Sequence, residues 1–230
     1  MARRTQRSER RGHALTRARI VQAAVEILDS DGEDALTFRA LAARLATGSG
    51  AIYWHVADKS DLLAAATNEV IVGALAEPDH RSEPSQAIRA IAIAVFDAID
   101  AHPWIGAQLF RDPAQPASLR ISEGIGRRLQ ALGVPEPALF DCWSALVNYI
   151  LGVAVQNAAN ARLLPRETER TAFLAGIADR WTQLDPAKYT FVRQVAGRLR
   201  DHDDREQFLA GIDLILAGIA TVTRPSEAPH

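Results

Sequence analysis

The sequence predicts an all-α protein, with an N-terminal three-helix helix-turn-helix domain joined to a larger C-terminal helical domain. Ala, Leu, Ile and Arg dominate its 230 residues, whereas runs of β-branched residues bounded by turns are scarce. Apolar residues recur at helical spacing in the segments between glycine and proline breaks. The composition, 48% hydrophobic and 23% charged, is that of a globular chain able to bury a core.

Charge is divided unevenly along the chain. Residues 1–19 hold seven arginines and one glutamate, a net charge of +6, whereas the remaining residues carry a net charge of −8. We expect residues 1–15 to form a disordered basic arm, because they are polar and lack an apolar period. Two interpretations of this arm are open: a solvated tail, or a segment that contacts phosphates or the minor groove of a nucleic acid.

Several classes of protein are excluded by the motifs that the sequence lacks. The single cysteine, Cys142, cannot form an intrachain disulfide, and no cysteine or histidine spacing predicts a metal site. The chain has no GxSxG elbow, no glycine loop for phosphates and no HExxH motif, so we expect neither enzyme activity nor a cofactor. No apolar segment reaches the ~18 residues of a membrane span, and the arginine-rich start lacks the apolar core of a signal peptide. We therefore expect a cytoplasmic protein.

The first predicted helix begins after Thr16, whose hydroxyl can cap the first turn. Asp31-Gly32 ends it. Its apolar residues recur three and four apart on one face and are Ile20, Ala23, Ala24, Ile27 and Leu28. We expect this helix to brace the two that follow.

The stretch from Leu36 to Leu63 predicts a helix, a glycine-containing turn, a short helix and the start of a third helix. Thr37 is a suitable N-cap, and Leu36 with Leu41 has the spacing of a hydrophobic staple. Residues 47–50, Thr-Gly-Ser-Gly, break the first helix. This layout is that of a helix-turn-helix, whose second helix enters the major groove of DNA.

The second helix of this motif is predicted over residues 51–56, which is too short to be stable without its neighbours. Asp58, with Asp61 three residues on, resembles a capping box and opens a longer helix that runs to about residue 77.

The run Tyr53-Trp54-His55-Val56, with the following Lys59 and Leu62-Leu63, is the most specific part of the sequence. Together with the helix before it, this run resembles the DNA-binding domain of the TetR family of transcriptional repressors. The tetracycline repressor subgroup is the most similar. The resemblance is specific over residues 16–77. Beyond them it concerns only the architecture, that is, the succession of helices.

The resemblance implies a domain organisation in which the boundary falls inside a continuous helix. We expect a DNA-binding domain at 16–62, a ligand-binding and dimerisation domain at 63–223 and a disordered tail at 224–230. A continuous helix across the boundary would let movement in the larger domain swing the DNA-reading end.

The family motif implies a set of DNA-contacting residues on the two helices and the turn between them: Thr37, Arg39, Gly48, Ser49, Gly50, Ala51, Tyr53, Trp54, His55 and Lys59. Arg39 is the best candidate for reading a base, since a guanidinium can bond to both guanine acceptors. Tyr53, His55 and Lys59 can donate to phosphates, which positions the protein without specifying a sequence. Taken alone, Trp54 is better explained as a packing residue.

Residues 49–51, Ser-Gly-Ala, differ from the Gln, Pro and Thr that the tetracycline repressor has at these places. We therefore expect a different operator. Because few long side chains remain for direct readout, we expect the shape of the DNA to contribute more.

Beyond residue 84 the sequence predicts a succession of helices at 85–101, 104–110, 118–132, 136–162, 166–184, 186–199 and 208–222. Two segments, 138–156 and 207–222, are apolar nearly all round and must be buried on several sides. We expect a homodimer through the helices near 138–160 and 207–222, as the resemblance also implies. The alternative is a monomer that buries both helices in its own core.

Polar and aromatic residues are interleaved in these apolar helices, and the resemblance implies that they line a ligand pocket. The predicted ligand-binding residues are Phe96, His102, Trp104, Gln108, Phe110, Trp143, Asn148, Tyr149 and Gln156. Taken singly, each aromatic residue is also explained as core.

The tetracycline subgroup binds a drug-chelated magnesium through two histidines and an acidic residue. In this sequence the corresponding positions fall on Leu75, near Leu109 and on Gln156, which cannot replace those ligands. We therefore expect a metal-free site for an apolar or aromatic effector.

These observations predict a ligand-responsive transcriptional regulator, most simply a repressor, that binds a pseudo-palindromic operator as a homodimer and is released by its effector. The alternative is a ligandless DNA-binding regulator or an activator.

Overall fold

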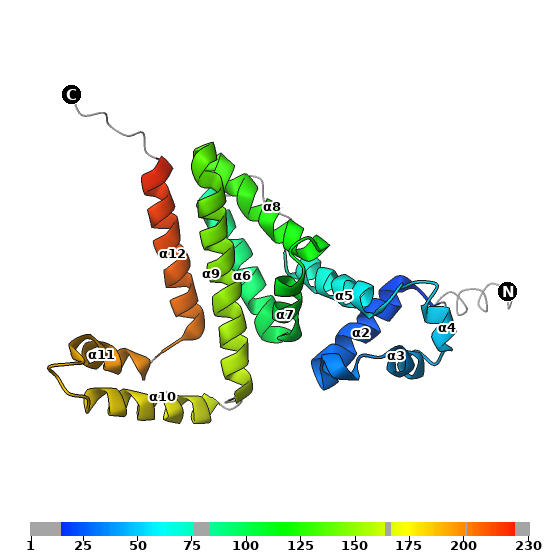
Figure 1. The fold of residues 1–230 in the computed structure, drawn as a ribbon, viewed down its shortest axis with the longest axis horizontal. Helices are drawn as coiled ribbons and strands as arrows, with labels where there is room; N and C mark the ends of the chain where they lie inside the picture. The colour runs from blue at the N-terminus through cyan, green and yellow to red at the C-terminus, as the bar shows by residue number, and fades with distance from the viewer. Residues whose placement is uncertain (1–14, 76–82, 164–166, 201, 224–230) are drawn as a thin grey trace, which may run out of the picture. The chain divides into compact units, whose positions relative to one another are not determined.

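The computed structural model describes residues 15–75, 83–163, 167–200 and 202–223, and these ranges contain helices but no strand. The predicted all-α fold is therefore confirmed. The basic arm before residue 15 and the tail after residue 223 lie outside the described residues. In chain order (Figure 1), the helices are α2 (Arg17–Asp31), η1 (Glu33–Ala35), α3 (Phe38–Arg44), α4 (Ser49–Ile52), α5 (Lys59–Ala74), α6 (Pro84–Ala101), α7 (Trp104–Arg111), α8 (Pro116–Ala131), α9 (Glu136–Leu163), α10 (Glu167–Thr182), α11 (Thr190–Val195), η2 (Ala196–Leu199) and α12 (Asp204–Thr223).

The helices form two compact units. The first unit comprises residues 1–78 and 101–123, and so holds α2 to α5, α7 and the first part of α8. The second unit comprises residues 79–100 and 124–230, and holds most of α6, the end of α8 and everything from α9 to α12. The structure thus joins α7 to the helix-turn-helix, although α7 is far from it in sequence.

Polar caps start the helices of the first unit where the sequence predicts them. Thr16 and Thr37 each accept a hydrogen bond from the backbone N–H three residues on, at 3.2 and 3.1 Å. Asp58 accepts from the N–H of Asp61 at 2.8 Å. The Asp61 carboxylate accepts from the N–H of Ala57 at 3.1 Å rather than from that of Asp58, so the reciprocal capping box is displaced by one residue.

The helix-turn-helix has a buried core of its own. The two residues predicted as a hydrophobic staple, Leu36 and Leu41, are both fully buried. The remaining buried side chains come from α2, α4 and α5, and include Ile20, Leu28, Ile52, Val56, Leu62 and Ala66. These contacts stabilise α4, which has only four residues and cannot persist alone.

The turn between α3 and α4 differs from its prediction. Helix α3 ends at Arg44, and the residue with left-handed backbone is Ala46, with a φ of 49°, whereas Gly48 has a φ of −83°. The glycines there mark the turn without forming its left-handed residue. The reading helix covers Ser49–Ile52 instead of 51–56, because the chain turns again at residues 53–55.

In the second unit, α6 runs antiparallel beside α12. Two ion pairs link them, Arg89 with Asp213 at 3.1 Å and Arg205 with Asp97 at 3.0 Å. Between these pairs, the ring of Phe96 stacks on that of Phe208, with centroids 4.6 Å apart.

Helix α9 lies along α12 (Figure 1), and the two approach closely at Gly211. The hydroxyl of Tyr149 donates to the carbonyl of Phe208 at 3.2 Å, and their rings stack. A Cβ at Gly211 would lie only 1.8 Å from the Tyr149 hydroxyl oxygen, so the backbone of α12 can approach α9 only because this residue has no side chain.

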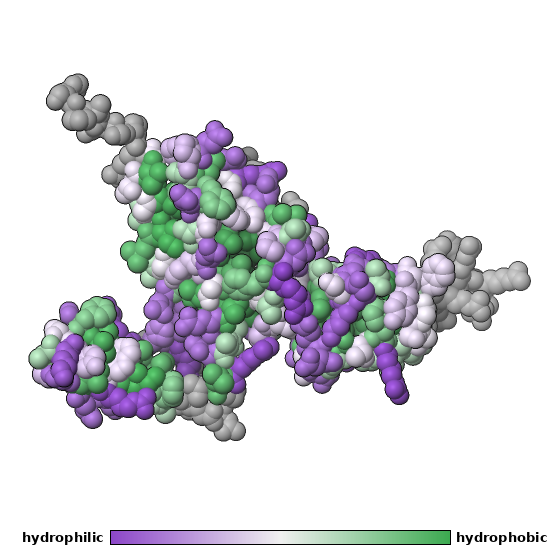
Figure 2. Space-filling model, viewed as in Figure 1, coloured by the Kyte–Doolittle hydropathy of each residue, from purple (hydrophilic) through white to green (hydrophobic). Residues whose placement is uncertain are grey.

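The long apolar helices of the second unit correct one prediction. By length and composition, α9 and α12 are each long and apolar enough to cross a membrane, whereas the sequence analysis expects no membrane-spanning segment. Only 28% of the apolar window of α9 and 17% of that of α12 is buried. Apolar side chains therefore gather at the surface over these helices (Figure 2).

Candidate nucleic-acid interface

The residues predicted to contact DNA lie at the surface of the first unit. Thr37 and Arg39 are exposed at the start of α3, and Gly48, Ser49 and Gly50 are exposed at the start of α4. Ala51, His55 and Lys59 are half-buried, while Tyr53 and Trp54 are exposed. The structure thus brings the predicted set onto α3, α4, the turn after α4 and the first residue of α5, where the residues are at least partly accessible to a partner.

The ring of Tyr53 has a fixed support. It stacks on Phe38, the first residue of α3, with centroids 4.4 Å apart and planes only 8° from parallel. Such pairs contribute about 0.5–1.5 kcal/mol beyond area burial. The prediction did not include Phe38, because the apolar stripe of α3 explains its neighbours without it.

The packing interpretation of Trp54 is wrong. Its side chain is 90% exposed, because Ile52 and Val56, on either side of it, fill the core instead. The indole is thus free of the core, and its contact with DNA stays a prediction.

The ammonium of Lys59 is partly engaged inside the unit. It donates to the backbone carbonyl of Glu33 at 2.6 Å, a contact absent from the predictions. An ammonium has three donors, so this bond leaves capacity for a phosphate.

Two other arginines of the unit are paired with carboxylates. Arg17 lies 2.8 Å from Asp61, and Arg44 lies 2.8 Å from Glu26. Because Arg44 shares α3 with Arg39 but bonds to α2, the two arginines of this helix have different surroundings.

The predicted ligand-binding residues are divided between the two units. His102, Trp104, Gln108 and Phe110 belong to the first unit, and the other five, Phe96, Trp143, Asn148, Tyr149 and Gln156, belong to the second. Their role in ligand binding stays a prediction.

In the first unit, three of these residues bond to carboxylates that the sequence analysis did not single out. The Nδ1 of His102 and the Nε1 of Trp104 lie 2.8 and 2.7 Å from Oδ1 of Asp29. Gln108 donates to Glu33 at 2.8 Å. No sequence pattern could have indicated these pairs, since their members are more than 70 residues apart.

In the second unit, the predicted residues have two kinds of surroundings. Phe96 and Tyr149 both stack on Phe208 in the interior, whereas Asn148 and Gln156 are exposed. Trp143 is half-buried beside Phe140, with ring centroids 5.6 Å apart.

Burial raises the pKa of two groups in the second unit. Burial raises the pKa of the Cys142 thiol, and the Asp141 carboxylate adds to this effect. Burial also raises the pKa of Tyr149. Within the described residues, no group of three His, Cys, Asp or Glu side chains is arranged to hold a metal ion.

Comparison with protein families identifies both parts of the chain. Residues 20–66 match the family described as bacterial regulatory proteins, tetR family, and residues 78–223 match the tetracyclin repressor-like C-terminal domain. The second match alone covers more than half of the chain.

Two curated relatives are transcriptional regulators. An HTH-type transcriptional regulator of Saccharopolyspora erythraea is 32% identical over 154 residues, which cover 65% of this chain and 64% of the relative. The HTH-type transcriptional repressor DrrR1 of Streptomyces coeruleorubidus is 27% identical over 163 residues, covering 68% of this chain and 57% of the relative. The chain thus matches less than two thirds of the length of either.

Solved structures agree with the fold. The transcriptional regulator SCO7222, a TetR from Streptomyces coelicolor, is 50% identical, with a TM-score of 0.84 over 92% of this chain and 100% of that one. The Streptomyces coelicolor TetR family protein ActR in complex with actinorhodin, at 21% identity and the same coverage, has a TM-score of 0.75, which shows the fold alone.

The relatives named here are transcriptional regulators and not enzymes, which confirms the prediction of a non-catalytic protein. With both of its parts matched, the chain belongs to the TetR family of bacterial transcriptional regulators.

Proposed function

We propose that this regulator is a cytoplasmic repressor that binds a pseudo-palindromic operator as a homodimer and is released by a small apolar or aromatic effector. The observation that carries the proposal is the exposed reading surface, where Arg39, Ser49 and Trp54 face outward from a buried scaffold. Side chains held on short, braced helices reach base edges and phosphates without a large ordering cost.

The second copy is proposed to cover α9 and α12. Each helix has an exposed stripe of small or uncharged residues at helical spacing, with Ala145, Asn148, Gly152, Gln156 and Ala159 on α9, and Ala210, Leu214, Ala217, Gly218 and Thr221 on α12. Small residues let helices approach closely, and a two-fold axis would bring each stripe onto a partner. Leu214, within the α12 stripe, is 75% exposed.

A protein partner explains these stripes better than a membrane does. Gln156 lies within the α9 stripe, where lipid would leave its amide without a hydrogen-bond partner, whereas the amide nitrogen of Asn148 donates to Ser144 Oγ at 3.0 Å. Across an interface between two copies the same amides can bond to each other.

The effector is proposed to bind without a metal. Leu75, on which one magnesium ligand of the tetracycline subgroup falls, and Leu109, near which another falls, have no donor atoms, and Leu109 is buried. The structure of ActR in complex with actinorhodin, a protein of the same fold, supports the presence of an effector site.

Repression and release follow from the spacing of two reading helices. In the free dimer, the two copies of α4 are separated by the distance between successive major grooves, so both can bind DNA. The effector tilts α5, and this separation is lost. The repressor name of the DrrR1 relative supports the sign of this regulation.

A gel-shift experiment tests the proposal. The full chain is incubated at physiological salt with the DNA upstream of its own coding sequence, with and without a panel of polycyclic aromatic compounds. We expect a specific complex that one or more compounds dissolve. A specific complex that no compound of the panel dissolves would contradict an aromatic effector and favour a ligandless regulator. In a separate transcription assay with the same DNA, a rise in transcript on addition of the protein would show an activator.

A further inference from the structure

Phe38, the first residue of α3, lies at the edge of the helix-turn-helix core rather than inside it. It stands one helical turn before Leu41 and Ala42, which are the two buried residues of this helix. Its own side chain is only half-buried. Packing into the core therefore does not account for the whole of this ring, and part of it is available to another group.

Tyr53 occupies a position that the reading helix does not fix by itself. Helix α4 covers only Ser49–Ile52, and Tyr53 follows it as the C-cap. The Ile52 side chain just before it is fully buried, whereas the Tyr53 side chain is 57% exposed. A side chain so exposed, at the end of so short a helix, has few contacts that select one rotamer.

The stack between Phe38 and Tyr53 supplies such a contact. The ring centroids are 4.4 Å apart and the planes differ by 8°. A nearly parallel stack covers one face of the phenol ring and leaves its edge, which carries the hydroxyl, outside the contact. Phe38 itself stands on a fixed backbone, because the Thr37 cap accepts from the N–H of Ala40 at 3.1 Å. The first residue of α3 thus orients a side chain that follows α4.

We propose that Phe38 is a positioning residue of the DNA interface, which holds the Tyr53 ring so that its hydroxyl is directed at a DNA phosphate before DNA binds. Phe38 has no side-chain donor, so it acts through Tyr53 and makes no hydrogen bond to DNA. Orientation in advance removes the cost of ordering the tyrosine on binding, which amounts to about three- to tenfold in affinity for each half-site. This inference rests on the proposed DNA-binding function and on the predicted contact of Tyr53 with a phosphate.

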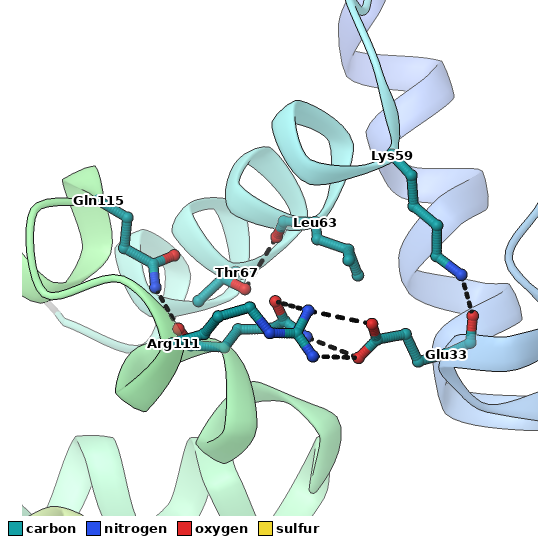
Figure 3. A network of polar contacts seen from close by, with 7 residues as sticks. Glu33, Lys59, Leu63, Thr67, Arg111 and Gln115 are labelled. Carbon is teal, nitrogen blue, oxygen red and sulfur yellow. Dashed lines mark hydrogen bonds and ion pairs between the residues drawn. The ribbon is translucent and has the colours of Figure 1, made fainter.

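Lys59 is predicted to contact a phosphate in a different way. Its ammonium is held by the bond to the Glu33 carbonyl at 2.6 Å (Figure 3) and carries a charge. A cation that binds a phosphate releases counterions, so its loss changes the dependence of affinity on salt. A phenol hydroxyl is an uncharged donor. Loss of the Tyr53 contact should therefore lower affinity and leave the salt slope unchanged.

Arg39 follows Phe38 on α3, and its predicted contact with a base would report a distortion of that helix. If Phe38 served only to hold α3 in place, its loss would displace Arg39 and relax the base preference. A phosphate contact carries no sequence information. Loss of the stack should therefore weaken binding to every duplex by the same factor and leave the base preference intact.

The test is fluorescence anisotropy of the full-length protein with a duplex that it selects from a random pool, at several salt concentrations. Phe38→Leu keeps an apolar side chain but removes the ring. It should weaken binding by about three- to tenfold for each half-site, with salt slope, base preference and urea midpoint close to those of the wild type. Phe38→Tyr keeps the ring and should bind within about twofold of the wild type. Leu119→Ala, which removes a 55% exposed side chain from α8 in the same unit, is the control and should bind as the wild type does.

Tyr53→Phe separates the hydroxyl from the stack, because it keeps the ring and removes only the donor. It should weaken binding at least as much as Phe38→Leu does. In the double variant, Phe38→Leu should add no more than about twofold to the loss, because the hydroxyl that Phe38 positions is already absent.

Four results would overturn the inference: wild-type affinity in Phe38→Leu, its full loss persisting in the Tyr53→Phe background, a relaxed base preference in Phe38→Leu, or an equal loss in Leu119→Ala. Wild-type affinity in Tyr53→Phe would exclude the phosphate contact, and the inference with it. Failure to select any duplex would contradict the proposed DNA-binding function, on which the inference depends. A selected duplex that Phe38→Leu binds as well as the wild type contradicts the inference alone.

Discussion

The two units bury the residues of their helices to different degrees. In the first unit, α2 buries seven of its 15 residues against the helices around it. In the second unit, the apolar windows of α9 and α12 are only 28% and 17% buried. A helix with uncovered apolar sides favours another surface, so we expect the second unit to be the one that packs against a partner.

The contacts of the two units differ in kind as well. Polar bonds at helix ends fix the first unit, from the caps at Thr16 and Thr37 to the carboxylate of Glu33. The second unit relies on contacts along the sides of its helices, where rings stack on Phe208 and Gly211 allows close approach. Bonds at the ends of a helix fix the direction in which it points, and contacts along its side fix its distance from the neighbouring helix. In the proposed function, the first unit would orient the reading helix and the second would hold two copies at a fixed spacing.

The largest effect should come from charging the uncovered stripe of α12. Leu214→Arg would place a guanidinium in the proposed dimer interface, where it has no partner. We expect the dimer to dissociate and operator affinity to fall by about 10²–10⁴-fold, because two linked reading heads bind far more tightly than one. Light scattering and gel shift measure both changes. Gln207→Arg, an exposed position near the start of α12, is the control; if both variants remain dimeric, the stripe is not the interface.

A second pair of substitutions compares a buried residue of the first unit with an exposed one. Ile52→Ala removes a fully buried side chain and should lower the free energy of unfolding by about 2–5 kcal/mol. Trp54→Ala should leave stability nearly unchanged, since the indole is 90% exposed, yet weaken DNA binding by about tenfold. Urea unfolding and fluorescence anisotropy measure the two quantities. A Trp54 variant that unfolds as easily as the Ile52 variant would mean that the indole is packed after all.

The two arginines of α3 provide a matched comparison for sequence readout. Arg39→Ala should relax base preference at one position of each half-site, with a loss of discrimination of about 1–3 kcal/mol. Arg44→Ala removes the same charge from the same helix but breaks only an exposed ion pair with Glu26, so it should leave base preference intact. Binding to a panel of single-base operator variants distinguishes them. Equal relaxation in both variants would exclude Arg39 as the base reader.

The smallest expected effect concerns the close approach of α9 and α12. Gly211→Ala would place a methyl group against the Tyr149 hydroxyl and should lower the free energy of unfolding by about 1–3 kcal/mol through overpacking. The double variant with Tyr149→Ala should recover part of the loss. Gly218→Ala, where a methyl group would meet no atom within 4 Å, is the control in urea unfolding. An unchanged midpoint for Gly211→Ala would mean that the two helices can separate without cost.

Local features of this fold could be predicted from the sequence, and contacts between distant residues could not. Thr16, Thr37 and Asp58 act through backbone groups three residues away, so spacing alone indicates them. Glu33 accepts a hydrogen bond from Arg111, and no periodicity connects residues so far apart. Trp54 was open to a packing interpretation because a single aromatic residue in a short helix has no pattern to show which side it faces.

The turn at Ala46 shows a second limit. Glycine is the usual sign of left-handed backbone, and the run at 47–50 offers two glycines, yet the left-handed residue is Ala46, just before them. The turn was therefore predicted correctly in kind but shifted in position, and the reading helix shifted with it.

Selection from random DNA tests the central claim most directly. The full-length protein is incubated with a pool of random duplexes at physiological salt, and the bound fraction is amplified and sequenced over several rounds. A dimer with two exposed reading helices should enrich an inverted repeat whose half-site centres lie about one helical turn, or a multiple of it, apart. Enrichment of a single unrepeated half-site, or of no sequence at all, would contradict a dimeric operator-binding regulator.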